Sequence, residues 1–184
     1  MSETTKEILF LQGGGPGAFA VDEKMVASLM SSLGQTYHVN YPRMPDEGSP
    51  NYELWRRDIE KELTLLQEGA ILVGHSVGAY ILLRFLIEQH VEHNLAGIFF
   101  IAMPFIGGNG WQLEGALEKS FAAKLPRHTP IFLYHCQDDT VVPFEHLQLY
   151  EQEIPQATVR IFNQGGHQLN SELSTVAEDI KSIS

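Results

Sequence analysis

The feature that most constrains this chain is a pentapeptide, Gly74-His75-Ser76-Val77-Gly78, which lies between two apolar segments. The four apolar residues at 70–73 predict a buried strand, and the apolar run at 80–87 predicts a helix. A strand that turns at once into a helix at G-x-S-x-G is the local context of a nucleophile elbow. In such a turn the serine takes a strained backbone conformation and projects its hydroxyl above the sheet.

Gly74 and Gly78 lie two residues before and two after the serine, where a sharp turn presses against neighbouring backbone and only a small residue fits. The helix after Ser76 would aim its N-terminal N–H groups at the place where negative charge develops in acyl transfer. His75 is expected to pack rather than to react. Because G-x-S-x-G is short enough to occur by chance, a functional assignment needs further residues elsewhere in the chain.

Predicted strands and helices alternate along the sequence. Apolar runs predict strands at 8–11, 37–41, 70–73, 95–103, 130–135 and 158–162. Helical spacing puts Val21, Met25, Leu29 and Leu33 on one face of a first helix, Trp55, Ile59, Leu63 and Leu66 on a second, and Leu169, Leu173, Val176 and Ile180 on the last. This alternation predicts an α/β fold, a three-layer, doubly wound and mainly parallel sheet of about six strands. Ligands of such sheets bind beyond the carboxyl ends of the strands.

Length and composition narrow the class of protein. A chain of 184 residues favours one domain over 1–184, and the stretch at 104–126 leaves room for only a short lid. The formal net charge of −11 argues against nucleic acid and membranes as partners, because binding phosphates needs a basic face. The single cysteine, Cys136, fits a reducing compartment, so we expect a cytoplasmic protein. The sequence shows neither a signal peptide nor an apolar run of the ~18 residues that a membrane span needs.

A serine hydroxyl becomes a good nucleophile when a histidine takes its proton and an acid holds that histidine in the right tautomer. Behind a nucleophile elbow, these partners follow in the order serine, acid, histidine. Asp139 follows the fifth predicted strand, and His167 follows the sixth. Both residues, together with Ser76, would therefore meet at one edge of the sheet.

Three motifs together resemble the α/β-hydrolase superfamily: residues 74–78, residues 137–143 and Gly165-Gly166-His167. The resemblance covers about residues 7–182 and is closest to the small, nearly lidless serine hydrolases of the retinoblastoma-binding-protein type. It implies that Ser76 is the nucleophile, His167 the general base and Asp139 the orienting acid. In the family pattern the acid lies four residues before a proline, here Pro143, which leaves Asp138 as the second candidate.

The resemblance also implies an oxyanion hole with two N–H donors. One donor comes from the residue after the serine, here Val77, and the other from the loop after the first strand. That loop has Gln12 where a histidine is usual, and it carries an extra glycine. Because proline has no N–H, Pro16 cannot donate, and the second donor is either Gly14 or Gly15.

Several residues have competing interpretations. The loop at 13–18 also matches G-x-G-x-x-G/A, a dinucleotide-binding pattern, but the acid expected after the second strand is missing and Pro16 removes an N–H. Cys136 is read as a small buried residue rather than a nucleophile. Phe105, Ile106 and Trp111 are read either as the lining of a substrate pocket or as core.

The sequence therefore predicts a serine hydrolase that cleaves a small acyl ester through an acyl-enzyme intermediate. It predicts a small-molecule acyl substrate as the partner and needs no cofactor and no metal. Two alternatives remain: a non-catalytic binding module on a hydrolase fold, and a hydrolase that acts on an amide or a thioester. The sequence leaves the oligomeric state open.

Overall fold

The computed structural model describes residues 5–89, 91, 94–112 and 114–183. Its six strands form one sheet with the order β2-β1-β3-β4-β5-β6, and every neighbouring pair is parallel. The strands are β1 (Lys6–Leu11), β2 (Tyr37–Asn40), β3 (Ala70–His75), β4 (Leu95–Ile101), β5 (Ile131–Cys136) and β6 (Thr158–Phe162). The predicted parallel α/β sheet is confirmed, and the arrangement is that of a minimal α/β-hydrolase fold.

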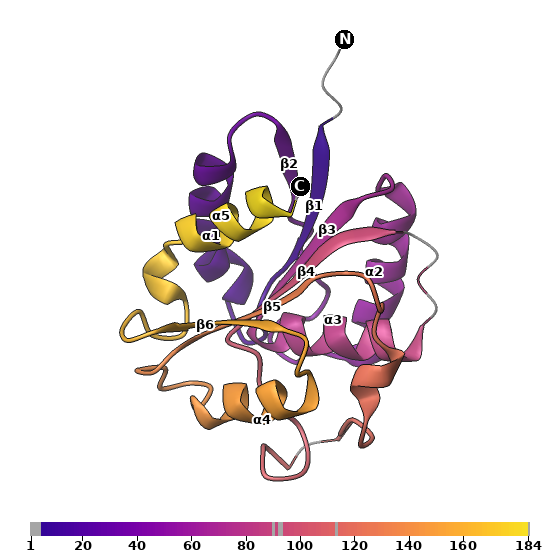
Figure 1. Cartoon of the computed structure of the whole chain (residues 1–184), viewed down its shortest axis with the longest axis vertical. Helices are drawn as coiled ribbons and strands as arrows, with labels where there is room; N and C mark the ends of the chain where they lie inside the picture. Colours follow the sequence, from indigo (N-terminus) through magenta and orange to yellow (C-terminus); the bar gives the residue numbers. More distant parts are fainter. Residues whose placement is uncertain (1–4, 90, 92–93, 113, 184) are drawn as a thin grey trace.

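Helices cover both faces of the sheet (Figure 1). One face carries α1 (Ala18–Leu33) and α5 (Ser174–Ser182), and the other carries α2 (Tyr52–Leu65), α3 (Ser76–Glu88) and α4 (Glu145–Glu153). Two short 3-10 helices, η1 (Phe121–Lys124) and η2 (Leu169–Ser171), lie in connections. The sheet is therefore the middle of three layers.

The central strand β3 shows why its sequence has no polar alternation. All six of its residues are buried, because neighbouring side chains of a strand point to opposite faces and both faces are covered. Ile71 packs with α1 and α5, whereas Leu72 packs with α2 and α3. At the sheet edge, by contrast, no residue of β6 is fully buried.

Two helix details differ from the sequence prediction. Val21 was expected on the buried face of α1, but it is 49% exposed, and the buried face is instead formed by Asp22, Met25, Val26, Leu29 and Leu33. The last helix was expected to include Leu169, but α5 begins only at Ser174. The reason is backbone conformation, since residues 169–171 all have positive φ, which an α-helix cannot accommodate.

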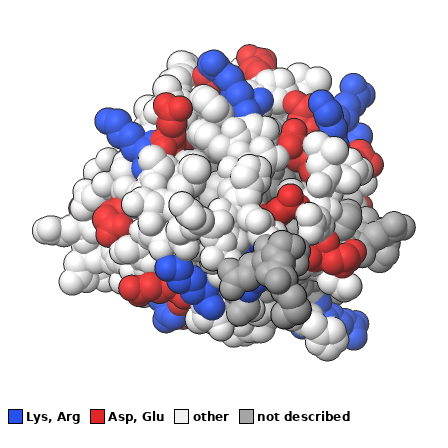
Figure 2. Space-filling model, turned by 90° about the horizontal axis from the view of Figure 1, so that it is seen from above, with Lys and Arg blue, Asp and Glu red and all other residues white. Residues whose placement is uncertain are grey.

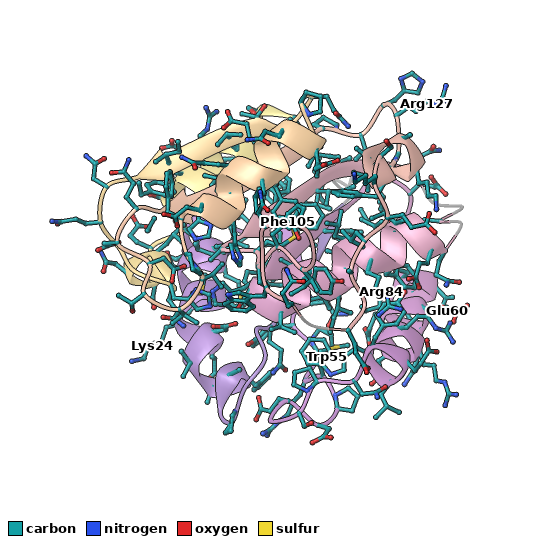
Figure 3. All side chains as sticks on the ribbon, turned by 90° about the horizontal axis from the view of Figure 1, so that it is seen from below. Lys24, Trp55, Glu60, Arg84, Phe105 and Arg127 are labelled. Carbon is teal, nitrogen blue, oxygen red and sulfur yellow. The ribbon has the colours of Figure 1, made fainter. Side chains whose placement is uncertain are left out.

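The connections at the carboxyl ends of the strands gather at one edge of the sheet. Figure 3 looks onto this edge and shows Phe105, which follows β4, near its middle, with Trp55 of α2 and Arg84 of α3 to one side. Figure 2 looks onto the opposite edge, where acidic and basic side chains are interspersed, and no continuous basic patch covers the described part of that face. Within the described ranges, no helix is both long and apolar enough to span a membrane.

The fold generates a test of close backbone packing. A Cβ atom at Gly78 would overlap the carbonyl oxygen of Gln12, whereas a Cβ at Gly48 would meet nothing closer than 3.8 Å. Gly78→Ala should therefore lower the free energy of unfolding by at least about 1–3 kcal/mol, the usual range for overpacking. Gly48→Ala is the matched control and should unfold like the wild type in urea. Equal stability of the two variants would contradict this account of the elbow.

Candidate active site

The nucleophile elbow forms where β3 turns into α3 without an intervening loop. Strand β3 ends at His75, helix α3 begins at Ser76, and Ser76 has a φ of 51°. This left-handed conformation is strained for a serine. A Cβ at Gly74 would lie 2.6 Å from the Cα of Ala79, so only glycine fits there. The turn therefore requires the small residues that its sequence supplies.

The structure brings Ser76, His167 and Asp139 into one hydrogen-bonded chain. The Nε2 atom of His167 lies 2.9 Å from the Ser76 hydroxyl oxygen, and its Nδ1 atom lies 2.8 Å from Oδ2 of Asp139. A carboxylate only accepts hydrogen bonds, so Nδ1 carries the proton and Nε2 is free to accept from the hydroxyl. All three residues are buried, with exposed fractions of 5% for Ser76, 9% for His167 and 8% for Asp139.

The surroundings tune the two ionisable members of this chain. Burial alone would raise the pKa of Asp139, but hydrogen bonds from His135 and His167 and from the backbone outweigh it and hold the pKa far below its usual range. Burial lowers the pKa of His167, although the hydrogen bond to Asp139 opposes this shift. At neutral pH the aspartate is therefore charged and the histidine is neutral, which are the states that proton transfer from the serine needs.

The neighbouring carboxylate, Asp138, has a different place. Its two oxygens accept hydrogen bonds from the backbone N–H groups of Gly165 and Gly166, at 3.2 and 2.8 Å. Asp138 is exposed and holds the turn that carries His167, whereas Asp139 contacts the imidazole itself. Of the two candidates for the acid, Asp139 is the one that lies within hydrogen-bond distance of the His167 ring.

The loop after β1 lies against the elbow. The N–H of Gly13 donates to Asp22 Oδ2 at 2.7 Å, and the N–H of Gly15 donates to the carbonyl of Glu47 at 2.6 Å. Gly14 is different, because its N–H meets no acceptor among the described residues. A Cβ at Gly14 would lie 3.1 Å from the Cβ of Val77, so the two residues are in contact. Val77 lies in the first turn of α3, where N–H groups have no acceptor within the helix.

The carboxylate of Glu47 lies at the N-terminus of α1, next to the loop whose glycines match the dinucleotide-binding pattern. This carboxylate accepts from the N–H of Phe19, in the first turn of α1, at 2.8 Å and from the side-chain amide of Gln12 at 2.9 Å. With these donors engaged, the N-terminus of α1 already binds an internal anion. In the pattern at 13–18, Gly13 and Gly14 pack closely against neighbouring side chains, whereas Gly15 and Gly17 adopt positive φ.

Sequence reasoning missed the role of Asp22 and gave His75 only a packing role. Asp22 Oδ2 lies 2.7 Å from Nδ1 of His75, and Nε2 of His75 lies 3.0 Å from the carbonyl oxygen of His167. Both side chains are 2% exposed. One signal was available, because Asp22 lies three and four residues before Met25 and Val26, in a core-facing position where an unpaired charge would be unfavourable.

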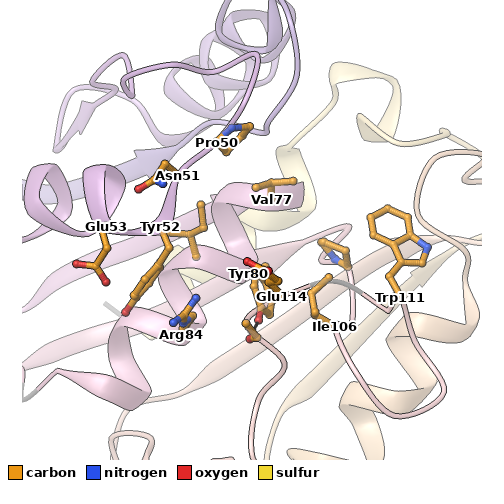
Figure 4. Close-up of a pocket in the computed structure, with 13 residues that line it drawn as sticks. Pro50, Asn51, Tyr52, Glu53, Val77, Tyr80, Arg84, Ile106, Trp111 and Glu114 are labelled. Atoms are coloured by element: carbon orange, nitrogen blue, oxygen red, sulfur yellow. Dashed lines mark hydrogen bonds between the residues drawn. The ribbon is translucent and has the colours of Figure 1, made fainter.

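A pocket of about 450 Å³ opens beside the elbow (Figure 4). Val77, Tyr80, Ile81 and Arg84 of α3 line it together with Pro50, Asn51, Tyr52, Glu53, Pro104, Ile106, Trp111, Glu114 and Gly115. Figure 4 shows Trp111 at one end and Glu53 at the other. Of the three candidate pocket residues, Ile106 and Trp111 line it, whereas Phe105 packs on the ring of Tyr150 with centroids 4.8 Å apart.

Cys136 ends β5 close to this edge, and its thiol is buried. Burial, followed by the charges of Asp138 and Asp139, raises the pKa of the Cys136 thiol to about 11. A thiol with such a pKa is protonated at neutral pH and is a poor nucleophile. The Ser76 hydroxyl, by contrast, has the imidazole of His167 within hydrogen-bond distance.

A sequence profile of the serine hydrolase family matches residues 27–178, which are most of the chain. The protein belongs to this serine hydrolase family. The YdeN protein of Bacillus subtilis (strain 168) is 26% identical over 134 residues, which are 70% of this chain and 69% of YdeN. The resemblance to serine hydrolases in the sequence is thereby confirmed.

Solved structures share the fold of this serine hydrolase. The crystal structure of the B. subtilis ydeN gene product superposes with a TM-score of 0.73 at 20% identity, covering 97% of this chain and 98% of the other. CarC, a serine hydrolase involved in carbazole degradation, superposes with a TM-score of 0.74 at 14% identity, covering 98% of this chain and 91% of CarC. An esterase domain from a Rhodothermus marinus protein superposes with a TM-score of 0.67 at 20% identity, covering 98% of this chain and 86% of that domain. At such identities these likenesses concern the fold.

The lowered pKa of Asp139 predicts how stability depends on pH. A carboxylate whose pKa is lower in the folded state than the unfolded value of about 3.9 stabilises the fold above that value, and this contribution is lost as the pH falls through and below it. Asp139→Asn should therefore be less stable than the wild type at pH 7. The difference in free energy of unfolding should shrink between about pH 5 and pH 2 in urea titrations.

The exposed residue Glu151 provides a control for this measurement. Glu151→Gln should follow the wild-type stability curve over the same pH range. A stability gap between wild type and Asp139→Asn that stays constant on acidification would show that the carboxylate charge is not what stabilises this loop.

Proposed function

We propose that this serine hydrolase is an esterase that cleaves a small acyl ester through an acyl-enzyme intermediate. The observation that carries the proposal is the continuous hydrogen-bonded chain from Ser76 through His167 to Asp139, with distances of 2.9 and 2.8 Å. A serine in a strained elbow, a neutral imidazole and a charged carboxylate are the three parts of a nucleophilic triad.

In the proposed reaction Ser76 is the nucleophile. Its Oγ attacks the ester carbonyl carbon while Nε2 of His167 takes the hydroxyl proton as general base. Asp139 stabilises the resulting imidazolium, which then gives its proton to the departing alkoxide, so that an alcohol leaves and an acyl-serine remains. Water activated by the same imidazole attacks the acyl-serine, releases the carboxylic acid and restores Ser76. This sequence requires neither a cofactor nor a metal.

The proposed oxyanion hole consists of the backbone N–H groups of Val77 and Gly14. Gly14 is favoured over Gly15 because the N–H of Gly15 already donates to the carbonyl of Glu47. Contact between Gly14 and Val77 supports two donors that act on one oxygen. Loss of a single donor of this kind typically slows turnover by ~10²–10³-fold.

The pocket beside Val77 is the proposed acyl site. Its apolar part includes Ile106 and Trp111, and its far part carries Arg84 and Glu53 (Figure 4). Arg84 is already paired with Glu88 at 2.7 Å and stacked 3.7 Å over the Tyr52 ring, so this far part is polar and internally bonded. Such a lining favours a short neutral acyl chain. We propose that segment 104–126, which supplies one wall of the pocket, acts as the short lid; Leu113 of this segment lies outside the described residues.

Replacement of the nucleophile tests the mechanism. Ser76→Ala should lower kcat for p-nitrophenyl acetate by at least about 10³-fold and abolish covalent labelling by a fluorophosphonate probe, because no other group can form the acyl-enzyme. The fold should persist, as judged by circular dichroism. Ser31→Ala, at an exposed serine on α1, should label and turn over like the wild type. Undiminished turnover by Ser76→Ala would refute the proposal.

The pocket predicts a chain-length profile. From acetate to butyrate, kcat/KM should rise, because each methylene buried in an apolar pocket contributes about 1–3 kcal/mol. It should then fall for acyl chains long enough to reach Arg84 and Glu53. Trp111→Ala should flatten the rise, whereas Leu65→Ala, at a residue 67% exposed on α2, should not. Esters, thioesters and amides of one acyl group, compared side by side, identify the leaving group. A steady rise up to long chains would contradict the proposed acyl site.

A further inference from the structure

Asp22 and His75 form a buried pair below the proposed triad, and the mechanism above does not use it. Nδ1 of His75 lies 2.7 Å from Asp22 Oδ2, and Nε2 lies 3.0 Å from the carbonyl oxygen of His167. The same Asp22 oxygen accepts the N–H of Gly13 at 2.7 Å. The pair therefore contacts the loop that carries the base and the loop that carries Gly14, and His75 itself precedes Ser76 in the chain.

The acceptors around His75 fix its protons. A carbonyl oxygen can only accept, so Nε2 must carry a proton toward His167. A contact of 2.7 Å between Nδ1 and a carboxylate oxygen needs a second proton between them. Burial alone would lower the pKa of His75, but the charge of Asp22 and the hydrogen bonds outweigh it and raise the pKa. The pair is thus an imidazolium bound to a carboxylate.

We propose that the Asp22–His75 pair is a positioning device that holds the His167 loop and the Gly13–Gly14 loop in register with Ser76; this inference rests on the proposed function. A hydrogen bond to the carbonyl of His167 restrains the residue whose ring must reach the serine. A hydrogen bond to the amide of Gly13 restrains the residue next to the proposed oxyanion donor. Because both bonds depend on the same pair, base and oxyanion hole are positioned together.

The pair also acts on the electrostatics of the base. The rings of His75 and His167 lie 4.7 Å apart, and the positive charge of His75 disfavours protonation of His167. The other charged groups nearby are Asp22, from α1, and Asp139, which His135 also contacts at 3.3 Å. Burial lowers the pKa of His167 most, and both aspartates favour its protonation, so His75 is the charged neighbour that adds to burial in keeping the base neutral at lower pH.

His75→Gln tests this inference. Glutamine can still donate to the His167 carbonyl, but it carries no charge. The rate constant for fluorophosphonate labelling of Ser76 should fall, and the acidic limb of its pH profile should move to higher pH, because the pKa of His167 rises. A displacement of about one pH unit would slow labelling about tenfold below the limb. A role in packing alone would lower the melting temperature and leave the limb in place.

Asp22→Asn tests the positioning role of the pair. An asparagine oxygen can accept from both Gly13 and His75 only if His75 holds its proton on Nδ1. In that neutral tautomer Nε2 has no proton, so it can no longer donate a hydrogen bond to the carbonyl oxygen of His167. We expect kcat for p-nitrophenyl acetate to fall on the order of tenfold or more, with KM within about twofold, because misplacement of reacting groups slows the chemical step.

Asp179→Asn is the matched control. Asp179 is also a buried carboxylate, and it accepts hydrogen bonds from Tyr134 and Arg160 without contacting the triad. It should lose stability without loss of kcat. Equal losses of kcat in Asp22→Asn and Asp179→Asn would overturn the inference, as would wild-type labelling with an unmoved limb in folded His75→Gln.

If His75→Gln fails to fold, the double variant His75→Gln/Asp22→Asn replaces it, because it leaves no buried charge unpaired. Its acidic limb should still move to higher pH, because His75 acts on His167 more strongly than Asp22 does. An unmoved limb in this variant would also overturn the inference. Failure of the proposed acyl-enzyme mechanism looks different, since the wild type itself would then not be labelled at Ser76, and failure of the ester assignment alone would appear only in the comparison of esters, thioesters and amides.

Discussion

The close approach of Gly78 to the carbonyl of Gln12 is the contact on which the rest of the site depends. It is possible only because β1 and β3 are neighbours in the sheet and because residue 78 has no side chain. This contact fits the loop after β1 against the first turn of α3, which brings Gly14 to Val77. The strained backbone of Ser76 persists because the sheet on one side and this packed loop on the other leave it no alternative.

Much of the fold could be predicted because strands buried on both faces of a parallel sheet have continuous apolar sequences. Runs such as Ile71-Leu72-Val73 are apolar throughout because both faces of the strand are covered. The errors arose where local backbone chemistry or a polar partner intervened. Asp22 displaced Val21 from the buried face because His75 and Gly13, distant in sequence, satisfy its charge. The start of α5 was misplaced because left-handed residues at 169–171 are invisible to a count of apolar spacing.

Some features of the candidate site could likewise be predicted from the sequence, and others could not. Ser76, Asp139 and His167 could be named from the sequence because each lies within a few residues of the end of a strand, and the carboxyl ends of parallel strands share an edge. The sequence could not show that the N–H of Gly15 is engaged, since its acceptor, the carbonyl of Glu47, comes from the connection after β2. Whether Phe105 faces the pocket likewise depends on Tyr150, a residue of α4. Side-chain partners from distant segments are what a single sequence conceals.

The order of the strands has a consequence for how reactivity arises during folding. The elbow follows a central strand, whereas His167 follows β6, the edge strand at the end of the sheet. Pairing of parallel strands is non-local and comparatively slow, so an intermediate that lacks β6 would hold Ser76 without its base. Such a species would carry an ordinary, inert alcohol. If Ser76 and His167 act as proposed, reactivity therefore requires β6 to be in place, and covalent labelling of Ser76 can report that this edge strand has docked.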